Sequence, residues 1–493
     1  MTEGRTHHGE SFDGELNRRI IRSSAWVALG HGGGQILSFA STLVLVRLLD
    51  PHAFGTVAVG VTLVAVISQI QESGLGSAFV QGRDRDQRVA ASSVLVFAAA
   101  AAFVLAAVTV ALAPLYTRLL HVPESTEFVQ VLALMLAIRG LAVVPGAMLE
   151  RELSFRYRTQ AELSAASVQM TVAITCAVAG LGAWSLVAGL LAGSATQASV
   201  LWLRAPWYPS PFKASRSMLR EMLRYGRFVS GTNVMVIANA NLDNAVVARF
   251  LGVGSLGVYN IAWRLAELPA TVIGVIVGRV MFSVYSRLQH DLDAVRAAYI
   301  QNLQRTMLFA LPLAVTLGVA AEPIVLGLLG SDWKGAIGPL RLLAVFGLVR
   351  LLIAPSGDLF RGIGRPHLSL AASITFFAVA LPSLLVLVPR LGTSGAALAM
   401  LAGVAASGGV LLTLTFRALE LRPYVLARAL ARPAACAGIV AVALVAALPE
   451  ARALGALAAL GLVAAVATGA FLIAVALLGR SLLIPIWAGL RRS

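Results

Sequence analysis

Charged side chains are scarce in this sequence. They make up 13% of its 493 residues, whereas hydrophobic residues make up 58%. Soluble proteins are usually about one-quarter charged, so this composition excludes a soluble protein and indicates an integral membrane protein. Cysteine is rarer still, since Cys176 and Cys436 are the only two and both fall inside apolar stretches. Two isolated thiols of this kind exclude a disulfide framework and a cysteine metal site.

Motifs for nucleotide binding and for catalysis are also missing. The glycines around His31 are not followed by Lys-Ser or Lys-Thr, so they do not form a phosphate-binding loop. No cluster of His and Cys ligands and no pair of carboxylates lies in a sizeable polar loop. We therefore expect no ATP-driven pump, no enzyme, no cofactor and no metal, and a protein that moves a substrate without transforming it.

Long apolar segments dominate what is present. Stretches of about 20 residues, the length that a helix needs to cross a bilayer, recur about fourteen times. A transmembrane β-barrel would instead show alternating segments of about ten residues. The sequence therefore predicts an all-α integral membrane protein with about 14 transmembrane helices.

Basic residues are concentrated in the connections predicted on one side of the membrane. Even-numbered connections and both tails carry most of the 39 Lys and Arg residues. Short loops rich in Lys and Arg remain in the cytoplasm, so we predict that both termini are cytoplasmic. Topology and anionic lipid headgroups, not nucleic acid, then account for the net charge of +16. The odd-numbered connections hold only Arg47, Arg118, Arg249, Lys334, Arg390 and Arg452.

Matching motifs in the two halves predict a parallel repeat of two six-helix lobes, followed by an extra helix pair. The matched motifs are Arg47 to Gly55 with Arg249 to Gly257, Leu181 to Gly193 with Leu391 to Gly403, and Arg139 and Pro145 with Arg350 and Pro355. The predicted parts are a cytoplasmic tail (1–23), an N-lobe (24–203), an amphipathic cytoplasmic linker (204–227), a C-lobe (228–416), a cytoplasmic loop (417–433), and the extra pair with the C-terminal tail (434–493).

Arg139 and Arg350 are each predicted near the bilayer midplane, in corresponding helices of the two lobes. An arginine at that depth is costly when it faces lipid, so it should face water or pair with an acid. Two interpretations stay open: a structural ion pair or carbonyl clamp, and recognition of an anionic passenger.

Three more charges are predicted inside spans. Arg264 and Glu267 are three residues apart, on one helix face before Pro269, and either pair locally or face a water-filled cavity. Asp243 either neutralises Arg249 or Arg264, or holds a proton or sodium ion.

Short motifs along residues 18 to 416 resemble the Wzx-type polysaccharide flippases of the multidrug/oligosaccharidyl-lipid/polysaccharide exporter superfamily. They are Arg18-Arg19 with Arg22 and Trp26, Val46 to Gly55, Gly74 to Gln81, Asp243-Asn244, Gly257 and Tyr259, Pro269, Glu322-Pro323-Ile324 with Trp333, and Gly392 with Gly395-Ala396.

The resemblance implies alternating access and transfer of a polyprenyl-pyrophosphate-linked oligosaccharide from the inner to the outer leaflet of the bacterial cytoplasmic membrane. Membrane lipids and proteins of polysaccharide polymerisation or export would be the partners. Forked guanidinium contacts suit a pyrophosphate, so Arg139, Arg264 and Arg350 are the candidate substrate-binding residues. Asp243 and Glu267 are the candidates for a coupled cation.

Two alternatives remain at this point. One is a cation-coupled multidrug exporter of the same architecture, whose cavity should be rich in acids and aromatic rings. The other is an enzyme or a noncatalytic membrane component of envelope polysaccharide assembly.

Overall fold

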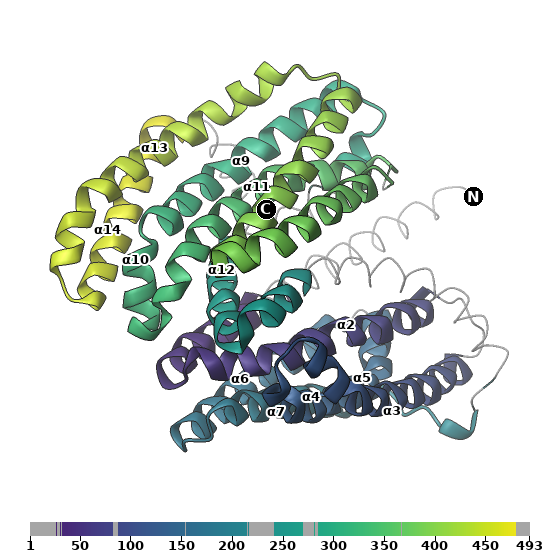
Figure 1. The fold of residues 1–493 in the computed structure, drawn as a ribbon. Helices are drawn as coiled ribbons and strands as arrows, with labels where there is room; N and C mark the ends of the chain where they lie inside the picture. Colours follow the sequence, from purple (N-terminus) through teal and green to yellow (C-terminus); the bar gives the residue numbers. More distant parts are fainter. Residues whose placement is uncertain are drawn as a thin grey trace, which may run out of the picture. The chain divides into compact units, whose positions relative to one another are not determined.

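A computed structural model describes residues 26, 30, 32–81, 87–152, 154–213, 215, 241–269, 281, 284–365 and 367–479. Regular structure within these residues is helical, without a strand. The chain divides into two compact units, Met1–Asn241 and Leu242–Ser493, coloured purple to blue and teal to yellow in Figure 1. The predicted all-α fold is confirmed.

Ten helices of the described residues are long and apolar enough to cross a membrane, or eleven with one bent pair. The bent pair is Leu292–Val319 with Ala321–Leu329, at an angle of 79°. Predicted spans 1, 7 and 8 extend into residues outside the described ranges, so the total of fourteen stays a prediction.

The first unit is a bundle centred on one helix. Helix α5 packs against α2, α3, α6 and α7, and these contacts enclose a core that includes Val57, Leu132, Leu136 and Val187. Apolar side chains on several faces of α5 explain its central place. The labelled helices of this unit are α2 (Pro51–Gln81), α3 (Gln87–Leu119), α4 (Thr126–Leu132), α5 (Leu134–Arg151), α6 (Phe155–Val178) and α7 (Ala183–Leu203), and Gly32–Leu48 is a further helix before them.

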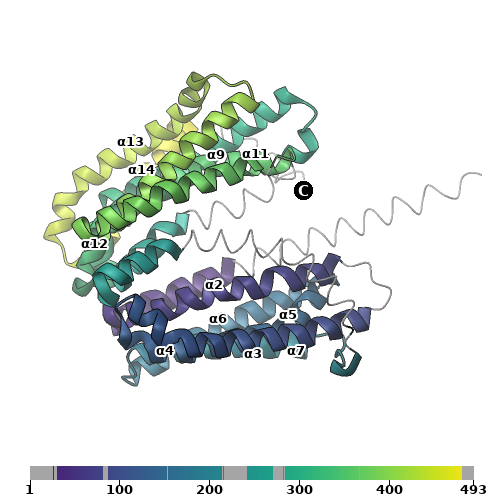
Figure 2. The same cartoon turned by 45° about the vertical axis from the view of Figure 1, so that its right-hand side comes forward.

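The second unit joins the C-terminal helix pair to the helices before it. Helix α11 packs on α9 and α12, and α13 packs on α9 and α14, an arrangement that can be followed in Figure 2. Leu308, Cys436 and Ala474 form a buried contact between α9 and the extra pair. The labelled helices are α9 (Leu292–Val319), α10 (Ala321–Ile324), α11 (Ile337–Gly362), α12 (His367–Ala418), α13 (Pro423–Ala453) and α14 (Ala456–Ala474).

Two long helical segments of this unit are hairpins. Helix α12 has 52 residues but is interrupted at Gly392. In the segment Asn241–Pro269, the Tyr259 hydroxyl donates to Asp243 Oδ2 at 2.7 Å across 16 positions, although 16 residues of straight helix would rise about 24 Å. The chain reverses at Gly252, whose φ is +77°.

The backbone repeats where the sequence predicts it. Gly182 before α7 has φ 53° and ψ −131°, and Gly392 between the arms of α12 has φ 63° and ψ −143°. Such a conformation is nearly restricted to glycine. Gly193 and Gly403 each pack closely on the preceding helix, against Gln169 and Ala380. The matched turns and the matched close contacts support a repeated helical hairpin.

Several predicted parts lie outside the described residues. The N-terminal tail (1–23), most of the amphipathic linker (204–227), the start of the C-lobe (228–240) and the last residues of the chain (480–493) are among them. The lobe boundaries and the cytoplasmic placement of both termini therefore stay predictions.

Candidate functional site

An ion pair joins two helices in the middle of the second unit. Arg350 Nη1 lies 2.7 Å from Glu267 Oε1, and the two side chains are 47% and 28% exposed. Glu267 belongs to the second arm of the Asn241–Pro269 hairpin, and Arg350 belongs to α11. The structure therefore brings together two of the five predicted site residues, from positions 83 residues apart.

A close approach between helices makes this pair possible. A Cβ added at Gly347 would lie 3.2 Å from the carbonyl oxygen of Ala266, so α11 runs tight against the hairpin arm there. Arg350 follows Gly347 by three positions and lies on the same helix face. The small residue thus sets the interhelical distance at which the guanidinium reaches Glu267.

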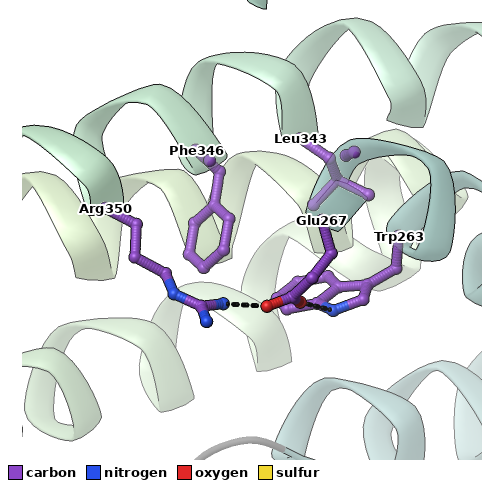
Figure 3. A pocket seen from close by; sticks show the side chains of 7 residues that line it. Trp263, Glu267, Leu343, Phe346 and Arg350 are labelled. Carbon is purple, nitrogen blue, oxygen red and sulfur yellow. Dashed lines mark hydrogen bonds and ion pairs between the residues drawn. The ribbon is translucent and has the colours of Figure 1, made fainter. Parts of the chain in front are cut away.

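Aromatic rings surround the pair. Trp263 Nε1 donates to Glu267 Oε2 at 2.7 Å, and the Trp263 and Phe346 rings are 4.9 Å apart. Figure 3 shows Glu267 between Arg350 and Trp263, with Phe346 projecting toward the pair from α11. An open pocket with about 200 Å³ of empty space is lined by Trp263, Ala266, Glu267, Leu343, Phe346, Gly347 and Arg350.

Asp243 lies on the other arm of the hairpin. It is 2% exposed, and its Oδ2 accepts the hydrogen bond from Tyr259, a fully buried residue one turn before Trp263. Its Oδ1 has no hydrogen-bond partner, and no ion pair joins it to Arg249 or Arg264 within the described ranges. The hairpin turn places the Tyr259 hydroxyl against this carboxylate, and both roles considered for Asp243 stay predictions.

The other two predicted arginines differ from Arg350. Arg264 is exposed on the hairpin arm, next to Trp263, and takes part in an interaction of its own. Arg139, on α5 of the first unit, is half-buried and has no ion pair or hydrogen bond among the described residues.

Arg139 and Arg350 lie at matching positions along their spans. Arg139 is 16 residues after the start and 12 before the end of the candidate span Pro123–Arg151. Arg350 is 19 residues after the start and also 12 before the end of the candidate span Ser331–Gly362. At 1.5 Å per residue, both are about 18 Å from the end of the helix, the depth at which a charge needs water or a partner.

Sequence reasoning missed the aromatic members of the site. Tyr259, Trp263 and Glu267 recur every four residues, which places them on one face of the hairpin arm. That spacing around a charged residue was the available signal. Phe346 carried no such signal, because its contact with Trp263 depends on how two distant helices pack.

An exposed row of hydroxyl groups on α6 was also missed. Ser167, Thr171 and Thr175 recur every four residues and are exposed. The exposed residues in the middle of α3, such as Phe103 and Val104, are apolar instead. The low hydropathy of this segment was the signal in the sequence: its most apolar 18-residue window has a mean hydropathy of 1.4, and among the candidate spans of the described residues only Asn241–Pro269 is as low. Each of these hydroxyls donates to the carbonyl four residues earlier, and the row is more polar than the exposed face of α3.

A cluster of three or more metal-ligating side chains does not occur in the part of the chain that the structure describes. The predicted charged groups are Arg139 in the first unit and Arg264, Arg350, Asp243 and Glu267 in the second. They can hold anions, hydroxyl groups or a single cation, according to which of them are paired.

Long apolar helices and mid-span charges together define a multi-pass helical membrane protein with a polar site inside its spans. Residues 44–338 match the family described as "Polysaccharide biosynthesis protein". Because this match covers more than half of the chain, the chain belongs to that family.

Two bacterial proteins of cell-surface polysaccharide synthesis are similar in sequence. The succinoglycan biosynthesis transport protein ExoT of Rhizobium meliloti (strain 1021) is 28% identical over 66% of this chain, and the match spans 66% of ExoT, just under two thirds of its length. The lipopolysaccharide biosynthesis protein WzxC of Escherichia coli (strain K12) is 24% identical over 78% of each chain.

A solved structure of the lipid II flippase MurJ in an inward closed conformation has a similar fold. The TM-score is 0.76 at 14% identity, with 94% of this chain and 100% of that chain covered. The predicted link to polysaccharide biosynthesis is thus confirmed by the family match, and the fold is shared with that solved structure.

Proposed function

We propose that this protein moves a polyprenyl-pyrophosphate-linked oligosaccharide from the cytoplasmic to the outer leaflet of a bacterial cytoplasmic membrane, by alternating access. The observation that carries the proposal is a set of arginines in the middle of membrane spans, in a chain that belongs to a polysaccharide biosynthesis family. A charge at that depth is costly unless it serves a cavity or a partner.

Arg139 is the strongest candidate for contact with the pyrophosphate. It lies in mid-span, and no acid among the described residues forms an ion pair with it. Guanidinium groups bind phosphate oxygens through two parallel hydrogen bonds. Arg264, exposed on the hairpin arm, and Arg350, half-exposed at the pocket, complete the proposed substrate-binding set.

Asp243 is the better placed of the two candidates for a coupled cation. One of its carboxylate oxygens has no hydrogen-bond partner among the described residues although the side chain is buried, and an unsatisfied buried acceptor favours a proton or a small cation. Both oxygens of Glu267 already accept a hydrogen bond or ion pair. We therefore assign the coupling role to Asp243 first and to Glu267 second.

Export of cationic compounds fits the site less well. An exporter of that kind needs an acid whose charge is available next to aromatic rings. Glu267 does lie beside Trp263, but Arg350 neutralises it at 2.7 Å. The pair therefore leaves no net negative charge to attract a cation.

We also propose how the protein acts, how it is oriented in the membrane and which partners it has. The protein transfers its substrate without forming or breaking a covalent bond, both of its termini face the cytoplasm, and it works with membrane lipids and with proteins that polymerise or export the glycan. The excess of Lys and Arg in even-numbered connections supports this orientation.

Depletion of the protein tests the function. We expect a lipid-linked oligosaccharide to accumulate in the inner leaflet, and we expect surface polysaccharide to be lost. In the depleted strain, Arg139→Lys should restore part of the surface polysaccharide, because the charge remains while the fork is lost. Arg139→Ala should restore none.

Arg118→Ala is the matched control, because it removes an exposed arginine at the end of α3. Its surface polysaccharide should equal that of the unaltered protein. Full activity of Arg139→Ala, at an equal amount of protein in the membrane, would refute the assignment of Arg139. Depletion without any accumulated lipid-linked sugar would refute the flippase itself.

A further inference from the structure

The segment after α7, residues 203–213, is held against the first unit by aromatic contacts. The Trp207 side chain packs on a buried cluster of α3 and α5, and the Arg88 guanidinium lies 5.9 Å from the centre of its ring. The Tyr208 ring is stacked on Trp202 of α7, with ring centroids 6.0 Å apart and an angle of 7° between the planes. Trp202 in turn donates to a backbone carbonyl of α5 at 3.0 Å. These contacts give the segment a defined surface.

The segment lies close to the level at which the membrane begins. Ser215 N donates to Ser93 Oγ at 2.8 Å, and Ser93 is six residues, or about 9 Å, from the start of α3 at Gln87. Helix α3 has 33 residues and is therefore about 50 Å long. When it is centred on a hydrocarbon core of about 30 Å, it projects about 10 Å at each end. Ser93 then lies near the boundary of that core, and the chain returns to this boundary after α7.

Large apolar and aromatic side chains of this segment point away from the protein. Leu203, Tyr208 and Phe212 are 76%, 68% and 98% exposed. Helix α7 ends at Leu203, so Phe212 lies well beyond the end of the span and is not part of a lipid-facing helix. Burying such side chains releases free energy in proportion to the apolar area removed from water, and amphipathic rings collect where a membrane meets water. The exposed face therefore suits the membrane interface.

Positive charge flanks these side chains. Arg204 and Lys213 are both exposed, and the Arg204 guanidinium lies 5.2 Å from the centre of the Tyr157 ring. The sequence has no Asp or Glu between Glu162 and Glu221, so no acid of the segment itself offsets the two cations. Lys and Arg next to a membrane are attracted to anionic headgroups. Apolar tips between cations match a phospholipid, whose phosphate lies directly above its acyl chains.

We propose that residues 203–213 form a membrane anchor of the first unit. Leu203, Tyr208 and Phe212 enter the interface of an anionic phospholipid bilayer, and Arg204 and Lys213 contact its phosphate groups. This inference goes beyond the proposed transport function and does not depend on it. The anchor fixes the start of the predicted linker (204–227) at the surface of the membrane.

A fluorescent label at Phe212→Cys tests the insertion in the full-length, cysteine-free protein. The protein is placed in nanodiscs of phosphatidylglycerol that contain a lipid with a spin label near its glycerol. Because an interfacial segment lies about 5–10 Å inside the headgroup boundary, the spin label should quench this fluorophore roughly threefold more strongly than one at Glu152→Cys. Glu152 is the control, since it is an exposed acid just after α5, at the end of the unit where α5 contributes to the cluster under Trp207.

Equal quenching at the two positions would overturn the anchor. A label at position 212 that neither the spin-labelled lipid nor aqueous iodide quenches would also overturn it, because another part of the chain would then cover this face.

The choice of an anionic lipid has its own test. In the protein labelled at position 212, Lys213→Glu should reduce the quenching in phosphatidylglycerol but not in phosphatidylcholine, because only the first lipid carries net negative charge. Lys334→Glu, at an exposed lysine of the second unit, is the control and should change neither value. Unchanged quenching of the Lys213→Glu variant in phosphatidylglycerol, or an equal loss in both lipids, would refute the contact with phosphate groups.

Discussion

The Glu267–Arg350 pair offers a quantitative test of the site. The partners are 2.7 Å apart, but 28% and 47% of their side chains are exposed. Fully exposed pairs contribute about 0.2–1 kcal/mol, whereas removing one partner of a buried pair costs about 3–5 kcal/mol. For this intermediate exposure we expect a coupling free energy of roughly 1 kcal/mol in a double-mutant cycle of Glu267→Gln and Arg350→Gln.

The two single substitutions should differ. Arg350→Gln takes the Arg350 charge away from the less exposed partner, Glu267, whereas Glu267→Gln leaves the more exposed Arg350, which water can solvate. Arg350→Gln should therefore lower the free energy of unfolding more than Glu267→Gln does. The amide oxygen of Gln can still accept from Trp263 Nε1, so the cycle isolates the charge interaction.

Unfolding of the purified variants in mixed micelles, followed by tryptophan fluorescence, measures these free energies. The pair Glu322–Arg452 is the control, since its atoms are 3.2 Å apart and its side chains are 38% and 64% exposed, so its coupling should be smaller. The reasoning fails if the control pair couples as strongly as Glu267–Arg350, or if Glu267→Gln is the costlier substitution.

Two further predictions concern the backbone and the exposed faces. Gly182→Ala and Gly392→Ala should each lower the free energy of unfolding by about 1–3 kcal/mol, because both glycines have positive φ. Gly438→Ala is the control and should not lower it, because Gly438 lies in a helix with open space around it. Equal effects of all three substitutions would contradict the repeated turn. In a cysteine-free background, Thr171→Cys should react with a membrane-impermeant maleimide at least ten times faster than Phe103→Cys does, since Thr171 belongs to the hydroxyl row of α6 and Phe103 is exposed among apolar residues of α3; equal rates would mean that the row faces lipid.

Much of the fold was predictable because it depends on local properties. Apolar segments long enough to cross a bilayer indicated the membrane helices, and the spacing of Leu181 to Gly193 and Leu391 to Gly403 indicated the repeat. The two glycines in those motifs have nearly the same backbone angles, so a repeated conformation requires a repeated residue. The mid-span depth of Arg139 and Arg350 followed in the same way, from the constant rise of a helix.

The partners of the charged groups were harder to predict. Along the sequence, Arg264 is the nearest cation to Glu267, yet the ion pair with Glu267 comes from Arg350 on α11. The sequence left the partner of Asp243 open, and the reversal at Gly252 places Tyr259 against it. Each contact depends on which helices approach each other. For the ion pair, that approach is the close packing of Gly347 against Ala266.

By itself, the sequence determined that this protein is a helical membrane protein, how it repeats, and how deep its arginines lie. These properties follow from hydrophobicity and helix geometry over short stretches of chain. Only the tertiary structure decided that Arg350 is neutralised by Glu267 beside Trp263 and Phe346, whereas Arg139 has no such partner among the described residues. The physical reason is that a contact between helices depends on the shape of both surfaces at once, and residues 83 positions apart carry no local signal of it.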